Sequence, residues 1–298
     1  MCGIVGLLVK KPQLRESLGE LMVPMLLGMS QRGPDSAGLA VFTETLASNH
    51  RKYSLYAGDQ DFYWMGLAQD MAMQLGAKPD IEEHGNHAVL TSELASDVVR
   101  QWFKEYYPQL SVLSVGRSID LYKDAGKPAD VAKRYDFKSL QGSHVVAHTR
   151  MATESAITPA HAHPFTAGED FCLVHNGSFS NPNDIRRQLK PYGIHFETDN
   201  DTEAACRYLE WRMREGDDLE TAIDKGFTEL DGFYTLLMGT ADKLALVRDA
   251  FGCKPAVVAE TDDYVAISSE FHALAHLPDI KHANIYEPEP EEMYVWTV

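Results

Sequence analysis

The sequence is short of cysteine and of basic residues. Its four cysteines, at positions 2, 172, 206 and 253, are scattered over 298 residues and form no Cys-x-x-Cys pair. This spacing argues against a disulfide framework or a zinc site and favours the cytosol, so we expect a cytoplasmic protein. Lysine and arginine number 27 against 44 aspartates and glutamates, a net charge of −17. Such an acidic chain is not expected to bind nucleic acid or an anionic membrane.

Long apolar runs are also missing. The apolar run 4–9 is too short to span a membrane, and no basic region precedes it, so it does not resemble a signal peptide. A run of this length, rich in β-branched residues, is typical of a buried strand. With 298 residues, the chain fits one large domain that carries an insertion.

Strand-like segments gather towards both ends of the chain. The composition predicts strands at 4–9, 38–42, 144–148, 171–175, 233–239, 244–248, 256–259, 264–268 and 293–298, and helices at 14–30, 202–214 and 219–230. Between them, residues 87–94, 96–107 and 110–115 predict a strand, a helix and a strand, which we expect to form a small βαβ-like insertion packed on the main sheets. Many strands with few long helices predict an α+β domain with stacked sheets.

Cys2 stands directly behind Met1. Removal of Met1 gives one residue both a thiol and a free α-amine, whose pKa values lie near ~8.5 and ~7.7–8.0. The amine can then accept the thiol proton, so nucleophile and base are preassembled. The alternative is a small buried residue at the start of a strand.

Two strand ends carry further candidates for a site. Arg150 follows the end of the predicted strand 144–148, and its planar guanidinium suits the carboxylate of an amino acid. Asn176 offers an amide donor and Gly177 a closely approachable backbone N–H, which are the two donors that an oxyanion hole needs. In isolation, Arg150 is equally consistent with a surface arginine, and the Asn-Gly pair with a hairpin turn.

Three other segments are ambiguous. In residues 31–38 (QRGPDSAG), Arg32 and Asp35 can form a local ion pair across a turn. The acidic residues of 197–203 can cap a helix or hold a substrate ammonium. We expect His161 and His163 to share a strand face, where a metal site is conceivable, although no further ligand has a suitable spacing. We therefore predict no metal.

Taken in order, these segments resemble the class II glutamine amidotransferases, members of the N-terminal nucleophile hydrolase superfamily. The resemblance rests on residues 2–6, 32–38, 148–150, 163–164, 175–177 and 201–203, and extends to 230–234, 248–255 and 268–270. It implies a four-layer αββα sandwich over residues 2–298, with an α/β insertion at about 44–114. It also implies release of ammonia from the side-chain amide of L-glutamine through an N-terminal cysteine thioester.

The resemblance also implies a role for each matching residue. Cys2 is the expected nucleophile, and Asn176 with Gly177 the expected oxyanion hole. Arg150, with Thr153 nearby, is expected to bind the substrate carboxylate. Asp201 is expected to bind the substrate ammonium, and Asp199 stays open as a second candidate.

Some features depart from the sugar-synthesising members of the family. Met151 stands where those members have a tryptophan, and Glu154 where they have a histidine. The 298 residues contain no synthase domain, so we expect a hetero-oligomer in which a separate subunit receives the ammonia. The length and residues 115–124 resemble the glutaminase-type subunits of glutamate synthase and N-methylglutamate synthase complexes. We expect no cofactor in this chain, and FMN, alone or with an iron–sulfur cluster, on the partner.

Two other functions fit part of these observations. An N-terminal cysteine amidase acting on another amide needs Cys2 and an oxyanion hole, but has no use for Arg150 paired with Asp201. A non-catalytic glutamine-sensing subunit needs Arg150 and Asp201, but tolerates loss of Cys2.

Overall fold

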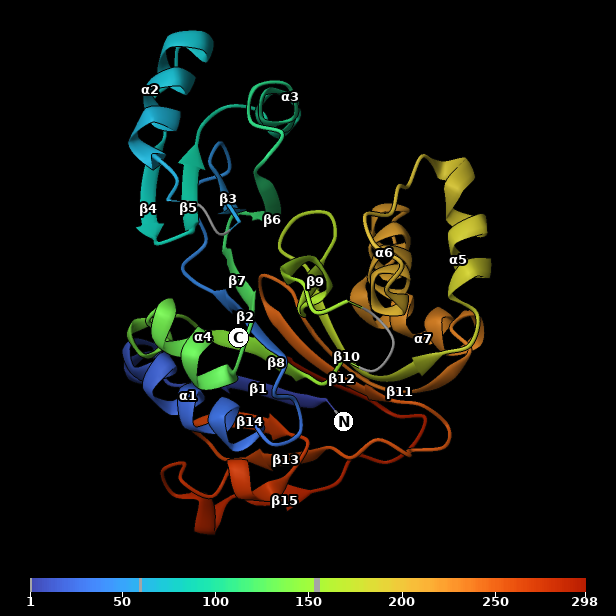
Figure 1. The fold of residues 1–298 in the computed structure, drawn as a ribbon. Helices are drawn as coiled ribbons and strands as arrows, with labels where there is room; N and C mark the ends of the chain where they lie inside the picture. Colours follow the sequence, from blue (N-terminus) through green and yellow to red (C-terminus); the bar gives the residue numbers. More distant parts are fainter. Residues whose placement is uncertain (1, 59–60, 153–155) are drawn as a thin grey trace.

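The computed structural model describes residues 2–58, 61–152 and 156–298. Figure 1 shows two large sheets with helices on their outer sides, and a third, smaller sheet that projects from one end of them. Within the described residues, none of the helices combines the length and the apolarity that crossing a membrane requires.

The first large sheet has seven antiparallel strands, and the N-terminal strand lies at its centre. Its order is β15-β13-β14-β1-β8-β2-β7. Every residue of β1 is buried, as expected for an apolar strand that is covered on both faces. The strands are β1 (Gly3–Val9), β2 (Ser36–Phe42), β7 (Ile119–Ala125), β8 (His144–Arg150), β13 (Val257–Glu260), β14 (Tyr264–Ser268) and β15 (Asn284–Tyr286).

The second large sheet has five strands and stacks on the first. Its order is β16-β12-β11-β10-β9, and all neighbours are antiparallel. Ile4 and Val146 of one sheet belong to the same buried apolar cluster as Val174 and Leu237 of the other. The strands are β9 (Phe165–Thr166), β10 (Cys172–Phe179), β11 (Gly232–Gly239), β12 (Lys243–Arg248) and β16 (Met293–Thr297).

Helices cover the outer faces of both sheets. Helices α1 (Leu18–Gly28) and α4 (Pro128–Arg134) pack on the seven-stranded sheet. Helices α5 (Pro182–Leu189), α6 (Asp201–Arg214) and α7 (Leu219–Glu229) lie on the side of the five-stranded sheet, where α6 and α7 share its outer apolar cluster. The predicted four-layer αββα sandwich is therefore confirmed.

The third sheet belongs to a separate unit, residues 51–116, which we call the β3–β6 unit. Its strands are ordered β4-β5-β3-β6, and its two helices pack on them around a core of their own that includes Trp64 and Trp102. The elements are β3 (Arg51–Tyr56), α2 (Trp64–Leu75), β4 (Asp80–His84), β5 (His87–Ser92), α3 (Ser96–Tyr106) and β6 (Ser111–Gly116).

The β3–β6 unit differs from the predicted insertion. The predicted strand, helix and strand correspond to β5, α3 and β6, but β5 and β6 are not neighbours, because β3 lies between them. Strand β3, helix α2 and strand β4 were not predicted. The unit forms its own sheet rather than a single βαβ layer on the main sheets, because four strands and two helices suffice to bury a separate apolar core.

Candidate functional site

Strand pairing places Cys2 beside the end of β8. Gly3 pairs with Thr149, so Cys2 lies next to the strand end that carries Arg150. The Cys2 thiol is partly buried and near the backbone N–H of Met151. Burial raises the pKa of this thiol, and the Met151 hydrogen bond and the nearby charges of Arg150 and Arg32 offset the rise only in part. The thiol is therefore protonated at neutral pH and needs a base.

Arg32 holds the backbone of Cys2 in place. Its Nε donates to the Cys2 carbonyl at 2.9 Å, and its Nη1 forms an ion pair with Glu270 at 2.6 Å. The expected pairing of Arg32 with Asp35 is therefore wrong. The Asp35 carboxylate instead accepts a hydrogen bond from the backbone N–H of Ala152 at 2.9 Å, and its own N–H donates to the Arg150 carbonyl at 3.1 Å. These bonds attach the turn at 31–38 to the end of β8.

A glycine is required where this turn meets β8. A Cβ on Gly33 would lie 2.2 Å from the carbonyl carbon of Thr149, far inside a normal contact distance. The close approach brings Arg32 and Asp35 to the segment that follows β8. The turn therefore belongs to the site and is more than a connection between helix and strand.

Arg150 is buried at the end of β8, with 4% of its surface exposed. Its Nη1 donates to the carbonyl of Ala156 at 3.1 Å. The alternative of a surface arginine is therefore excluded. Thr153, predicted to lie beside it, and Glu154 fall outside the described residues.

Asn176 and Gly177 lie on β10, which the structure brings against β8. The Nε2 of His148 on β8 lies 3.1 Å from the carbonyl of His175 on β10. Asn176 is 3% exposed, and its side-chain nitrogen has no hydrogen-bond partner among the described residues. A buried amide without a partner costs free energy, so this donor is available to an acceptor beyond the described residues, such as a bound substrate.

Gly177 has a backbone conformation and a close contact that only glycine accommodates easily. Its φ is +151°, and a Cβ at this position would lie 2.1 Å from the Phe233 carbonyl on the neighbouring strand. The residue pairs with Tyr234 of β11, so Asn176 and Gly177 lie inside a continuous strand pairing. The alternative of a hairpin turn at this Asn-Gly pair is therefore wrong.

A cluster of buried histidines lies next to Asn176 and Gly177 in the fold. Thr202 Oγ1 lies 2.9 Å from His163 Nε2 and 3.0 Å from His175 Nδ1, and the rings of His148 and His163 are 4.2 Å apart. The other ring nitrogen of each histidine has no partner among the described residues. Burial lowers the pKa of His148 to about 3 and that of His175 to about 4, and it holds the pKa of His163 well below its ordinary value. The cluster is therefore neutral.

His161 and His163 do not share a strand face. His161 ends a 3-10 helix, Pro159–His161, and its Nε2 lies 3.0 Å from Asp199, whereas His163 is buried against Thr202. The prediction was wrong because Pro159 and Pro164 prevent a regular strand here. Over residues 2–58, 61–152 and 156–298, no group of three or more histidine, cysteine, aspartate or glutamate side chains is arranged to hold a metal ion.

Asp199 and Asp201 have different surroundings. Asp201 begins α6 as predicted, and its carboxylate accepts a hydrogen bond from the backbone N–H of Phe179 at 3.0 Å and lies 3.7 Å from His175 Nδ1. It therefore lies at the end of β10, the strand that carries Asn176. Asp199 has an exposed side chain and pairs with His161. The structure places Asp201 at the site and Asp199 outside it.

Sequence patterns gave no signal for two of the residues that shape this site. Glu270, the partner of Arg32, is 238 positions away from it. Burial is the main cause of the lowered pKa of His175, and the charge of Asp201 opposes it. Lys254 is close enough to His175 for its positive charge to lower this pKa further. Both residues lie in segments that resemble the family, and that resemblance was the one signal available for them.

Comparison with known proteins assigns the chain to a family. The family model described as the glutamine amidotransferase domain matches residues 148–276. The chain is 45% identical over 297 residues to the glutamine amidotransferase-like protein GlxB of Rhizobium meliloti (strain 1021), a match that covers 99% of this chain and 98% of that protein. The chain therefore belongs to the class II glutamine amidotransferases, which are enzymes.

Two further relatives are longer than this chain. It is 30% identical over 165 residues to a glutamine–fructose-6-phosphate aminotransferase of Pyrobaculum aerophilum, a match that covers 55% of this chain and 27% of that protein. Among solved structures, it superposes on glutamine phosphoribosylpyrophosphate amidotransferase from B. subtilis with a TM-score of 0.63 at 18% identity. That superposition covers 99% of this chain and 47% of the solved one, so this chain spans about half its length.

Proposed function

We propose that this chain releases ammonia from the side-chain amide of L-glutamine and supplies it to a separate synthase subunit. The observation that carries the proposal is the buried amide of Asn176, which has no hydrogen-bond partner in the described part of the chain and lies on the strand that packs against the one carrying Arg150. Cys2 is adjacent to Arg150 through the pairing of β1 with β8. Nucleophile, oxyanion donor and carboxylate-binding cation thus lie at one end of the sandwich.

In the first step, the Cys2 sulfur attacks the side-chain amide carbon of glutamine. The thiol proton passes to the α-amine that Cys2 gains when Met1 is removed, and this amine then protonates the departing nitrogen. Asn176 and the N–H of Gly177 donate hydrogen bonds to the oxyanion as the carbonyl bond opens. Ammonia leaves and a thioester remains, which water hydrolyses to glutamate and the free thiol.

The substrate is held at its amino-acid end by two charges of opposite sign. In this proposal Arg150 binds the α-carboxylate, with Thr153 beside it, and Asp201 binds the α-ammonium. Binding at both groups fixes the side-chain amide near Cys2 and lowers the entropy cost of reaching the transition state. An amidase for substrates without an amino-acid end does not need this pair of charges.

The acceptor of the ammonia is proposed to be a separate protein. GlxB, which is matched over 98% of its length, is named only as amidotransferase-like, whereas the sugar-phosphate relative is matched over 27% of its length. By resemblance, the partner belongs to a glutamate synthase-like or N-methylglutamate synthase-like complex. It carries FMN, alone or with an iron–sulfur cluster, and forms a cytoplasmic hetero-oligomer with this chain.

The test has two stages. Purified protein, with loss of Met1 verified by intact mass, is assayed for glutamate release from glutamine, alone and with the proteins that co-purify with it. Glutamate release that depends on Cys2 is expected, and its absence in both assays would rule out the glutaminase. Tracing nitrogen from amide-labelled glutamine in the purified complex then identifies the acceptor, and label found only as free ammonia would rule out a dedicated partner.

A further inference from the structure

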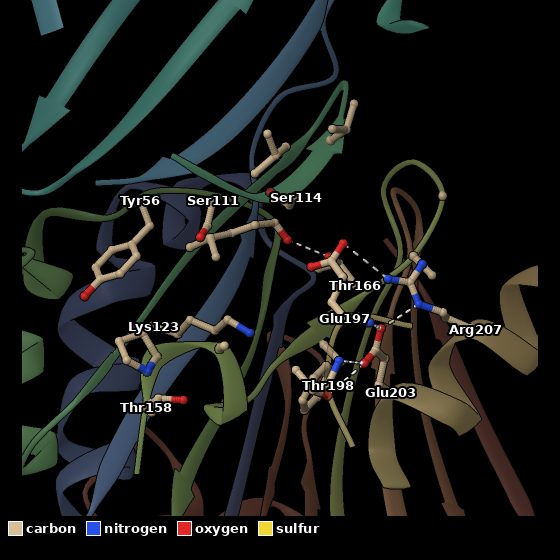
Figure 2. A pocket seen from close by; sticks show the side chains of 18 of the residues that line it. Tyr56, Ser111, Ser114, Lys123, Thr158, Thr166, Glu197, Thr198, Glu203 and Arg207 are labelled. Carbon is tan, nitrogen blue, oxygen red and sulfur yellow. Dashed lines mark hydrogen bonds and ion pairs between the residues drawn. The ribbon is translucent and has the colours of Figure 1, made fainter. Parts of the chain in front are cut away.

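A pocket of about 390 Å³ lies between the β3–β6 unit and helix α6, away from Cys2 and Asn176. Figure 2 shows it from close by. We call it the Lys123 pocket. The polar residues of its lining include Arg100 of α3, Ser111 of β6, Lys123 of β7, Glu197, Glu203 and Arg207. Its volume is within the range of ~300–1,000 Å³ that small-molecule sites occupy.

Lys123 is a buried cation that no carboxylate neutralises. It is 6% exposed, and its Nζ donates to the carbonyls of Ala162 at 2.9 Å and Pro164 at 3.3 Å. Among the described residues, no acidic side chain forms an ion pair with it within 4.0 Å. Burial lowers the pKa of Lys123 to about 8, so the group still carries a charge at neutral pH. Two of its three protons are engaged, and Figure 2 shows the ammonium pointing into the pocket.

The acidic side chains of the pocket form no ion pair with Lys123, although the charges of Glu197 and Glu203 oppose the lowering of its pKa by burial. Glu203 is saturated: its two oxygens accept from the backbone N–H groups of Glu197 and Thr198, from Thr198 Oγ1 and from Arg207 Nε. Glu197 is mostly exposed and lies 3.5 Å from Arg207. Both carboxylates are therefore directed at Arg207 or at the backbone, and neither is directed at Lys123.

The charge of the pocket favours a ligand with a single negative charge. Its three cations, Arg100, Lys123 and Arg207, exceed its two carboxylates by one. Arg100 is exposed at the rim, and no ion pair of this residue is found within the described chain. A carboxylate accepts hydrogen bonds from both ammonium and guanidinium groups. A phosphate dianion would add a second negative charge close to Glu197 and Glu203, where like charges repel.

We propose that the Lys123 pocket is a second ligand site, which binds a small organic molecule of one net negative charge through its carboxylate. Lys123 receives the carboxylate at the inner end of the pocket, and Arg100 and Arg207 face the outer end of the ligand. The site is separate from the proposed glutamine site, because Cys2, Arg150 and Asn176 are absent from its lining. The alternative is that Lys123 only fastens the loop at residues 162–164.

Isothermal titration calorimetry on the full chain distinguishes these readings. The probes are pyruvate, benzoate and L-glutamate, three monoanions of different size, with inorganic phosphate as a fourth. An Arg150→Gln background removes carboxylate binding at the proposed glutamine site, so the result does not depend on whether the glutaminase proposal holds. At least one of the three monoanions is expected to bind saturably to one site, and more tightly than phosphate.

Two variants on the pocket and one outside it complete the test. Lys123→Met should raise the Kd about 10-fold or more, as expected for a hydrogen bond to a charged group. Arg100→Gln, at the exposed rim, should raise it several-fold, and it keeps the test valid if Lys123→Met fails to fold. Lys127→Met, exposed after the same strand, is the matched control and should leave the Kd unchanged. The proposal is overturned by no saturable binding of the monoanions, by tighter binding of phosphate, or by binding that survives both pocket variants.

Discussion

Two regions of the molecule differ in how their buried polar groups are charged. One is the end of the sandwich that carries Cys2, and the other is the Lys123 pocket. Behind Asn176, three histidines and Thr202 form a network in which burial keeps every ring neutral. In the pocket, a protonated lysine contacts two carbonyl oxygens and the face of the Phe165 ring, and no carboxylate of the described residues pairs with it. A neutral network fixes the positions of its neighbours at little electrostatic cost, whereas an uncompensated ammonium leaves a positive potential for a ligand. The first arrangement suits precise chemistry and the second suits binding.

The largest expected effect concerns the nucleophile. Cys2→Ala should reduce glutamine hydrolysis to background, a loss on the order of 10⁴–10⁶-fold, because no thioester can form. Cys253→Ala is the matched control: this thiol is exposed and lies outside the site, so its loss should leave the rate unchanged. Steady-state glutamate release measures both variants. Appreciable activity in Cys2→Ala would favour a direct attack by water and exclude the proposed mechanism.

A chain that retains Met1 should be as inactive as Cys2→Ala. The α-amine then belongs to another residue, and the buried thiol, with its raised pKa, lacks its base. Comparing intact mass with activity across preparations checks this, since activity should scale with the fraction of chains that begin at Cys2. Full activity in a preparation that retains Met1 would show that the base lies elsewhere.

The oxyanion donor is expected to act on the rate rather than on binding. Asn176→Ala should lower kcat about 10²–10³-fold with a small change in KM, because the donor strengthens its bond as negative charge develops. Asn183→Ala, on exposed helix α5, serves as the control. A rise in KM at unchanged kcat would instead assign Asn176 to ground-state binding.

Substitution of Asp201 and of Asp199 should have different effects on the KM for glutamine. Asp201→Asn is expected to raise the KM for glutamine about 10- to 100-fold, the range for losing a charge-assisted hydrogen bond, while leaving the fold intact. Asp199→Asn, two residues away and exposed, should change KM less than about twofold. The reverse order would move the ammonium site to Asp199 and contradict the surroundings seen in the structure.

Some of this arrangement follows from local sequence, and some does not. Cys2 and Arg150 lie at or beside strand ends, which apolar runs and turn residues mark in the sequence, whereas Asn176 lies inside β10, which continues to Phe179. Their convergence depends on strand pairings such as Gly3 with Thr149, between residues 146 positions apart, which no local pattern encodes. Helix α2 was missed because its exposed face carries Met65 and Met73, which blur its apolar periodicity.

The neutral histidines predict a loss of stability in acid. Their pKa values are lower in the folded chain than the ordinary value near ~6.5, so below that pH the unfolded chain binds more protons and stability falls. The stabilisation is complete above about pH 6.5 and is lost as the pH falls towards 4, by about 2 kcal/mol each for His148 and His175 between pH 7 and pH 5. Urea unfolding at the two pH values measures this. Equal stability at both would mean that the cluster protonates without unfolding.

The lowered pKa of Lys123 predicts that its contribution to the stability of the fold rises in alkaline solution. Its pKa is lowered from 10.5 to about 8 in the folded chain. Between these values the unfolded chain binds the extra proton, so the contribution of Lys123 to stability rises with pH. Between pH 8 and pH 10, the free energy of unfolding of the wild type should therefore rise by about 2 kcal/mol relative to that of Lys123→Met. The comparison with the variant cancels the titration of the buried tyrosines, which both proteins share. If the free energies of unfolding of the two proteins instead change equally over this pH range, Lys123 is not held as an uncompensated charge. The contrast between the two regions then disappears.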